Sequence, residues 1–226
     1  MKAPNGKPTN LTERQWLQVR TKNFIDWFGD WINNPSQASK VVDENGEPLV
    51  VYHGSPNNWN VYNPKLFANN TDEGDYGQGL YLSSIKSKAE QYGNIKELFV
   101  NSKIPFRVGL DSKIGSIQEA TRRGQIVDLF GRENAPEELK QYDSVLYTGG
   151  EGKYEEIVIT NPNQIKSATS NTGEFSTTND DIRFSSVTEQ PNRQQSVQAF
   201  TERLPIEEQA QFMRSVARGD ISTACR

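Results

Sequence analysis

The chain has 226 residues, of which 34% are hydrophobic, and a formal net charge of -4. This lean composition predicts one domain with a modest core and polar extensions. Charges of both signs are mixed, so the sequence lacks the basic stripe that a dominant nucleic-acid interface needs. With one histidine and one cysteine (Cys225), an internal disulfide and a C-x-x-C site are excluded, and we expect no metal. No run approaches the ~18 apolar residues of a membrane span, and residues 1–10 show no secretion signal, so we expect a soluble protein.

Residues 12–33 predict one or two short helices with an aromatic face. Thr12 and Gln15 have the spacing of a capping box, in which each side chain bonds the other residue's backbone N–H. The large apolar side chains that follow are Trp16, Val19, Phe24, Trp27, Phe28 and Trp31. We expect these rings to pack onto a core rather than to stack on a ligand.

Short apolar runs bounded by turn residues predict the strands. They lie at 49–52, 79–82, 98–100, 105–108, 144–147, 156–159 and 164–168. Further helices are expected at 84–92, with Ser84 as N-cap, and at 116–123 and 136–141.

Composition divides the chain into three segments. We expect an N-terminal helical extension at 1–40, a central domain at 41–186 and a tail at 187–226. A polar linker at 186–198 leads into an amphipathic helix at 205–218.

Four short motifs follow one another along the central domain. His53 ends an apolar run in His-Gly-Ser, residues 77–79 (Gly-Gln-Gly) lead to Tyr81, a helical stretch reaches Tyr92, and Glu156 lies on a late strand. Each motif alone is weak, because a histidine at a strand end is more often structural and a strand glutamate usually faces solvent.

Together these motifs resemble the His-Tyr-Glu class of ADP-ribosyltransferases, which includes diphtheria-toxin-like toxins and poly(ADP-ribose) polymerases. The resemblance covers roughly residues 48–168, the length of one compact domain. The wider chain is similar to the ADP-ribosyltransferase domains of bacterial and phage polyvalent proteins and to bacterial exotoxins. Runs shared with the polyvalent proteins are Trp-Phe-Gly-Asp-Trp, Pro-Asn-Gln-Ile-Lys-Ser and Asp-Ile-Arg-Phe-Ser, here at 27–31, 162–167 and 181–185. Arginine-specific toxins fit less well, because they carry an arginine in the slot of His53.

The resemblance implies an α+β fold in which split antiparallel β-sheets surround an NAD cleft and the N-terminal helices pack outside it. The segment 41–186 would be the catalytic domain. It would transfer a single ADP-ribose from the co-substrate NAD to a macromolecular acceptor and release nicotinamide. The mild acidity of the chain favours a protein acceptor, a nucleic-acid acceptor stays open, and we favour a monomer.

The resemblance also assigns roles to individual residues. Glu156 would bind the hydroxyl of the nicotinamide ribose and stabilise the positive charge that develops as the bond to ribose C1 breaks. Tyr81 and Tyr92 would stack on the nicotinamide ring, and His53 would bond the adenosine-side ribose. The catalytic residues are thus Glu156, His53 and Tyr81, and the NAD-binding residues are His53, Gly54, Ser55, Tyr81 and Tyr92. Among these, the backbone of Gly54 would hold the carboxamide, since glycine permits a close approach.

Glu156 is assigned rather than its neighbour Glu155 because it lies eight positions before Gln164, as in the family's strand. Adjacent residues on a strand point to opposite faces, so at most one of the two glutamates faces the cleft of His53. Gln164 itself is expected to be structural.

One departure keeps other functions open. Three positions before Tyr92 the polymerases have a serine that holds the carboxamide, whereas this chain has Ala89, for which Ser55 or Ser87 could substitute. An inactive binding or scaffold module and an NAD glycohydrolase are the alternatives. An RNA 2′-phosphotransferase fits poorly, because it needs an Arg and His cluster to grip phosphate. A bacterial toxin, an effector and a phage enzyme are all compatible settings, in the bacterial cytoplasm or exported without a visible signal.

Overall fold

The computed structural model describes residues 1–64, 76–108, 130–133, 135–149, 152–171 and 173–183. Several predicted features lie outside these described residues: the helix at 116–123, the linker at 186–198, the helix at 205–218 and Cys225. Within the described ranges, no helix is long and apolar enough to cross a membrane.

The described ranges contain short helices and short strands. The helices are α1 (Glu13–Gln18), α2 (Lys22–Phe28), α3 (Lys86–Glu90) and α5 (Glu137–Lys140), with 3-10 turns at Pro35–Gln37 and Pro162–Gln164. The strands are β1 (Val51–Ser55), β2 (Leu80–Leu82), β3 (Asn94–Val100), β4 (Pro105–Arg107), β5 (Ser144–Thr148), β6 (Tyr154–Ile159) and β7 (Ile165–Ser167).

The two N-terminal helices begin at side-chain caps. Thr12 and Gln15 form the predicted capping box: the Thr12 hydroxyl accepts from the Gln15 N–H at 3.3 Å, and the Gln15 side chain accepts from the Thr12 N–H at 3.0 Å. Thr21 caps α2 in the same way through the N–H of Phe24. These caps satisfy N–H groups that a helix start leaves without partners.

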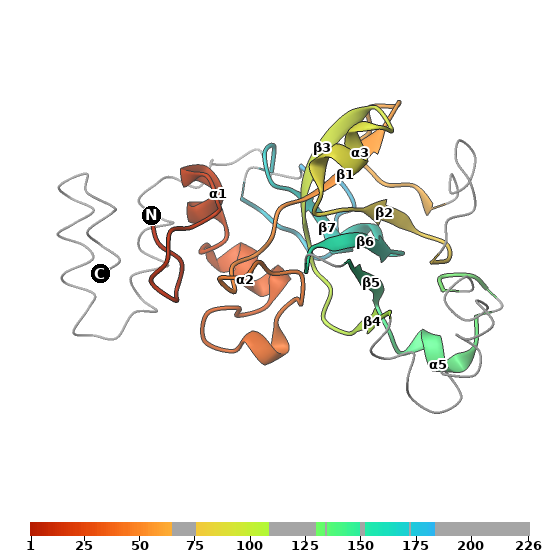
Figure 1. The fold of residues 1–226 in the computed structure, drawn as a ribbon, viewed down its shortest axis with the longest axis horizontal. Coiled ribbons are helices and arrows are strands. Elements are labelled where there is room, and N and C mark those ends of the chain that lie inside the picture. The colour runs from red at the N-terminus through yellow and green to blue at the C-terminus, as the bar shows by residue number, and fades with distance from the viewer. Residues whose placement is uncertain (65–75, 109–129, 134, 150–151, 172, 184–226) are drawn as a thin grey trace.

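An aromatic core joins the N-terminal helices to the first sheet. The ring of Phe24 meets Phe28 and Trp27 of its own helix, Phe99 of β3 and the distant Phe175, with centroid separations of 4.9 to 5.6 Å. The prediction that the aromatic residues of 12–33 pack into a core is therefore confirmed. Figure 1 shows α1 and α2 on the side of the three-stranded sheet, whereas α5 lies beyond β4.

A buried ion pair also stabilises the packing of the N-terminal helices. Arg20 donates from Nη2 to Glu47 at 2.7 Å, and the side chains are only 3% and 0% exposed. The guanidinium stacks 3.8 Å from the ring centre of Trp16, and Glu47 accepts a further hydrogen bond from Thr9. Glu47 belongs to a turn at 43–48, so the pair ties the N-terminal segment to the residues that lead into β1.

The strands form two sheets. One is antiparallel, with the order β1-β3-β7, and the other has the order β2-β6-β5-β4. The second sheet is mixed because β4 and β5 run parallel, so the expectation of wholly antiparallel sheets is wrong at this edge. The long connection between 107 and 144 explains the parallel pair, since parallel neighbours require a crossover of a dozen residues or more.

Strand alternation gives the two sheets a shared core. Residues that pack together between them come from both sheets: Val51, Leu80, Leu82, Leu98, Val100, Leu146, Ile157, Ile159 and Ile165. The sheets also touch directly, because Tyr52 of β1 and Ser83 beyond β2 exchange two backbone hydrogen bonds of 2.8 and 2.9 Å. The candidate residues of β1 and β2 are thereby brought next to one another.

Several predicted boundaries are wrong. Strand β3 begins at Asn94 rather than at 98, and β6 begins at Tyr154 rather than at 156. The first strand runs from Val51 to Ser55 rather than 49–52, because β1 pairs with β3 along its whole length and so includes His53. Helix α3 is capped by Ile85 rather than Ser84. The Ser84 hydroxyl instead donates to the carbonyl of Tyr154 at 3.0 Å, which ties the segment before α3 to β6.

Candidate active site

The predicted site residues come from both sheets and from the end of α3. They are His53, Gly54 and Ser55 on β1, Tyr81 on β2, Tyr92 two residues beyond α3, and Glu156 on β6. The hydroxyl of Ser55 accepts from the backbone N–H of Asn57 at 3.2 Å. Hydrogen bonds, close packing and strand pairing place the other predicted residues relative to one another.

His53 is bonded to the backbone of Tyr81. Its Nδ1 lies 2.8 Å from the Tyr81 carbonyl oxygen, and because a carbonyl can only accept, Nδ1 carries the proton. In the neutral ring Nε2 is then an acceptor, suited to a hydroxyl donor. Burial lowers the pKa of His53 and the charge of Lys96 lowers it further, against the opposing effect of the Tyr81 hydrogen bond.

Gly54 has no room for a side chain. A Cβ there would lie 1.8 Å from the carbonyl oxygen of Ala89 and 3.0 Å from the Cβ of Tyr92. The structure therefore gives the glycine a packing reason: β1 and the end of α3 approach more closely than any other residue would allow. This contact also sets Ala89 and Tyr92 beside the backbone that the resemblance assigns to the carboxamide.

The two tyrosines differ in their surroundings. The Tyr81 hydroxyl donates to the carbonyl of Gly77 at 2.7 Å and accepts from the N–H of Tyr76 at 3.0 Å, which fixes its ring. Tyr92 is 58% exposed. Gly79 lets β2 approach β6, because a Cβ there would lie 2.4 Å from the carbonyl oxygen of Ile159. One of the two tyrosine rings is thus fixed by hydrogen bonds, and the other is open to solvent.

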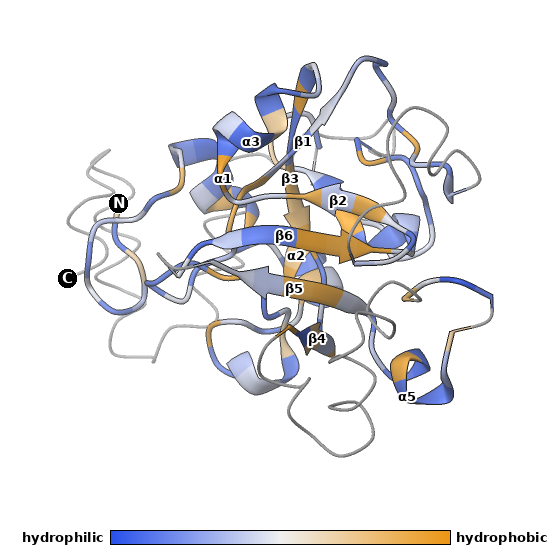
Figure 2. Ribbon diagram, turned by 45° about the vertical axis from the view of Figure 1, so that its right-hand side comes forward, coloured by the Kyte–Doolittle hydropathy of each residue, from blue (hydrophilic) through white to orange (hydrophobic). Residues whose placement is uncertain are grey.

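Glu156 lies at the boundary between the two halves of β6. Figure 2 shows this strand passing from hydrophilic residues at its start to hydrophobic residues at its end, and only the second half is buried. Tyr81 pairs with Val158, and alternate residues of a strand share a face, so Tyr81 and Glu156 lie on the same face of the sheet. Tyr147, whose ring stacks on Tyr76 at 5.4 Å, is the cross-strand partner of Glu156.

Glu155 has a basic partner on α3. Its carboxylate lies 2.5 Å from the ammonium of Lys88, and this bond raises the pKa of Lys88, with further contributions from Glu155, Glu156 and Tyr147. Lys88 is therefore within electrostatic reach of both glutamates. A bulge beside Thr148 interrupts the regular alternation from which opposite directions for the two glutamates were predicted.

Two pockets in the described part of the chain are lined by residues other than the predicted site residues. One, of about 270 Å³, is lined by Lys86, Ile95, Lys96, Glu97, Ser167, Thr169, Ser170 and Ile182. The other, of about 390 Å³, is lined by Asn101, Lys103, Asp143, Thr160, Asn161 and Gln164. Gln164 donates to the carbonyls of Asn101 and Asp143 at 3.2 and 2.8 Å, which agrees with its expected structural role.

No group of three or more His, Cys, Asp or Glu residues that could hold a metal ion occurs within the described ranges.

Comparison with known proteins identifies the class. A family model described as ADP-ribosyltransferase in polyvalent proteins matches residues 43–175, which is more than half of the chain and includes every candidate site residue. The two-sheet domain is thus of the ADP-ribosyltransferase class, as its motifs predicted. More particularly, the chain belongs to the ADP-ribosyltransferases of polyvalent proteins. Searches of curated proteins and of solved structures gave no match.

Sequence reasoning missed three side chains next to the predicted ones. Lys88 pairs with Glu155, Lys96 is the cross-strand partner of His53, and the ring of Trp59 lies 5.5 Å from the imidazole. Strand register would have revealed Lys96, but a single sequence does not supply it.

Proposed function

We propose that this chain is a mono-ADP-ribosyltransferase of the His-Tyr-Glu class, acting on NAD and a protein acceptor. The observation that carries the proposal is the joining of His53 to Tyr81 by a 2.8 Å hydrogen bond, with Glu156 on the same face as Tyr81, inside the segment that matches the family. Three strands, β1, β2 and β6, thus supply the proposed constellation.

NAD supplies the ADP-ribosyl group: the bond between ribose C1 and the nicotinamide nitrogen breaks, nicotinamide keeps the electron pair, and the acceptor bonds C1 and loses a proton. Glu156 is proposed to accept a hydrogen bond from the ribose hydroxyl and to stabilise the positive charge that develops at C1. Its position at the polar start of β6 supports this role, since its neighbours on that strand become buried immediately after it.

The proposed binding residues contact different parts of NAD. Tyr81 and Tyr92 are the proposed walls for the nicotinamide ring. The backbone of Gly54, beside Ser55, is the proposed carboxamide site. His53 is proposed to accept a hydrogen bond at Nε2 from a ribose hydroxyl. The tautomer with the proton on Nδ1, which the bond to Tyr81 selects, supports this role.

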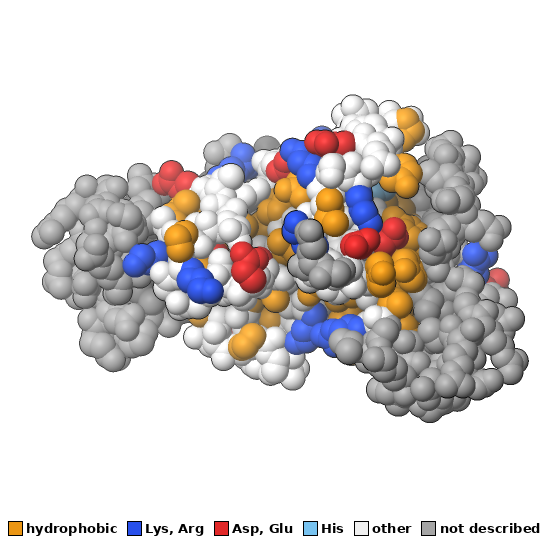
Figure 3. All heavy atoms as spheres, in the orientation of Figure 1, with side chains coloured by type: hydrophobic (Ala, Val, Ile, Leu, Met, Phe, Trp, Pro, Cys, Tyr) orange, Lys and Arg blue, Asp and Glu red, His pale blue; other side chains and the backbone are white. Residues whose placement is uncertain are grey.

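The acceptor and the setting follow from weaker features. Figure 3 shows acidic and basic side chains interspersed on one face, which supports a protein acceptor better than a nucleic acid. We propose transfer of a single ADP-ribose by a monomer, in a bacterial toxin, effector or phage protein.

The test compares two adjacent glutamates. Purified wild type, Glu156→Gln and Glu155→Gln are incubated with labelled NAD and a cell lysate, and both nicotinamide release and labelled protein are measured. Glu156→Gln should reduce the rate by ~10²–10³-fold, as for the loss of a single charge-stabilising group in other enzymes. Glu155→Gln is the matched control and should retain most activity, because its partner is the partly exposed Lys88.

The other outcomes each point to a different function. Nicotinamide release without a labelled acceptor would indicate an NAD glycohydrolase. An absence of release from wild type would favour the inactive module, for which Ala89 in place of the serine is the motivating feature. Equal losses in the two glutamine variants would remove the assignment of Glu156.

A further inference from the structure

A cationic and aromatic neighbourhood surrounds His53 and has no role in the site as proposed. Lys96 of β3 lies directly opposite His53 in the strand register, so the two side chains share a face. The ring of Trp59 touches both: its centroid is 5.5 Å from that of His53 and 5.0 Å from the ammonium of Lys96.

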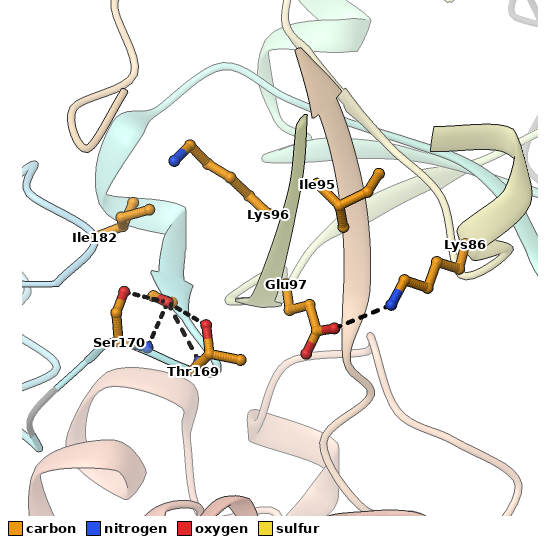
Figure 4. A pocket seen from close by; sticks show the side chains of 8 residues that line it. Lys86, Ile95, Lys96, Glu97, Thr169, Ser170 and Ile182 are labelled. Atoms are coloured by element: carbon orange, nitrogen blue, oxygen red, sulfur yellow. Dashed lines mark hydrogen bonds and ion pairs between the residues drawn. The ribbon is translucent and has the colours of Figure 1, made fainter. Parts of the chain in front are cut away.

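Lys96 points away from the acidic residue next to it. Figure 4 shows its side chain leaving β3 on the side of Ile182, whereas Glu97 points the other way, toward Lys86. Glu97 and Lys86 form an ion pair of 3.4 Å. Within the described residues, Lys96 has no ion pair, and its ammonium donates to the amide oxygen of Asn58 at 3.0 Å.

The charged group that acts on Lys96 is the guanidinium of Arg183, which is itself paired with Asp181 at 2.9 Å. Burial lowers the pKa of Lys96, and Arg183 lowers it further. Lys96 in turn disfavours the protonated form of His53. An ammonium has three N–H donors, so one bond to Asn58 leaves capacity for an anion.

We infer that Lys96 binds the pyrophosphate of NAD, with Trp59 as the wall that holds Lys96 and His53 in place. This inference rests on the proposed function. If a ribose hydroxyl binds Nε2 of His53, the phosphates of the same NAD molecule would lie next to Lys96, the cross-strand neighbour of His53. The ligand chemistry that fits is a diphosphate ester flanked by riboses, which ADP-ribose and NAD share.

Calorimetric titration with ADP-ribose and with adenosine tests the assignment. Lys96→Gln should weaken ADP-ribose binding by about tenfold to hundredfold, as expected for a bond to a charged group, and should leave adenosine binding unchanged. Lys96→Arg should restore most of the affinity. Lys86→Gln is the matched control, because it removes a lysine of α3 that pairs with Glu97, on the face of β3 opposite to Lys96, and should change neither titration.

A measurement on wild type covers the case in which Lys96→Gln does not fold. Methylation of the Lys96 amine, followed by mass spectrometry, should be slowed by ADP-ribose and not by adenosine; equal rates with and without ADP-ribose would overturn the inference. An equal loss of affinity for ADP-ribose and for adenosine in a folded Lys96→Gln would also overturn it. If wild type neither binds ADP-ribose nor releases nicotinamide, the proposed function fails as well, whereas active wild type with unaffected Lys96→Gln overturns the pyrophosphate site alone.

Discussion

The aromatic core under the N-terminal helices and the candidate active site use the same kinds of residue in opposite ways. In the core, Arg20 is enclosed between Glu47 and Trp16, and the Trp16 ring is 1% exposed. At the site, Tyr92 is 58% exposed and the Lys88–Glu155 pair is partly open to solvent. Rings and charges in the core are thus enclosed by the protein, while Tyr92 and the Lys88–Glu155 pair at the candidate site reach solvent. Substitutions in the two regions should therefore separate stability from activity.

The largest effect is expected in the core. Arg20→Met removes one partner of a buried ion pair and leaves the carboxylate of Glu47 without its guanidinium, which should cost about 3–5 kcal/mol of unfolding free energy. Urea denaturation measures this loss. Lys22→Met is the matched control: its pair with Asp26 is 74% and 54% exposed, so the expected cost is below about 1 kcal/mol. Similar costs for the two variants would contradict the contrast drawn between enclosed and open charges.

Lys166 should make stability depend on alkaline pH. Its side chain is fully buried on β7, its ammonium donates to the carbonyl of Asn179 at 2.5 Å, and burial lowers its pKa from 10.5 to about 8. Between these values the unfolded chain binds the proton more strongly, so stability rises with pH through this window and is lost as pH falls through about 8. We expect a gain of about 2 kcal/mol between about pH 7.5 and pH 9.5.

Urea denaturation across this pH range checks the expectation, with two variants for comparison. Lys166→Met should abolish the rise, whereas Lys103→Met, at an exposed position, should preserve it. If the stability of Lys166→Met rises with pH by the same amount, groups other than Lys166 cause the rise.

The sequence was sufficient for features that depend on neighbouring residues. The capping box of Thr12 and Gln15 and the aromatic packing around Phe24 follow from local spacing, and the structure contains both. Register was not predictable, because it depends on which strands pair. The juxtaposition of His53 and Lys96 is therefore a product of the β1–β3 alignment alone. Full burial of Lys166 was equally hidden, since it follows from pairing with Phe99 over the aromatic core.

Replacing Tyr81 or Tyr92 tests whether the rings at the candidate active site bind NAD. Tyr92→Ala should raise KM for NAD severalfold, in line with about 0.5–1.5 kcal/mol per aromatic contact, and should leave thermal stability nearly unchanged. Tyr81→Ala should raise KM and also lower Tm, because it loses the hydroxyl bonds to Gly77 and Tyr76. Nicotinamide-release kinetics and thermal unfolding provide the two readouts. Unchanged KM in both variants would remove the stacking assignment.

The smallest effect is expected from His53, at acidic pH. Burial holds its pKa in the folded protein below the ordinary value of 6.5, so the unfolded chain takes up the proton first as pH falls. The stabilising contribution is fully present above about 6.5 and is lost as pH falls through the lowered folded value. Urea denaturation from neutral pH downward should therefore show wild type losing stability relative to His53→Gln, which carries no titrating ring.

NAD binding should weaken over the same acidic range, because protonation turns Nε2 from an acceptor into a donor. The two readouts distinguish a ligand-binding histidine from a structural one. A structural role moves the stability curve alone, whereas the proposed ribose contact also raises KM for NAD as pH falls. If Lys96 is replaced by glutamine, the pKa of His53 should rise, since a neighbouring positive charge is removed. Both transitions should then move to higher pH together, and transitions that stay at the wild-type pH in Lys96→Gln would show that the two side chains are not coupled.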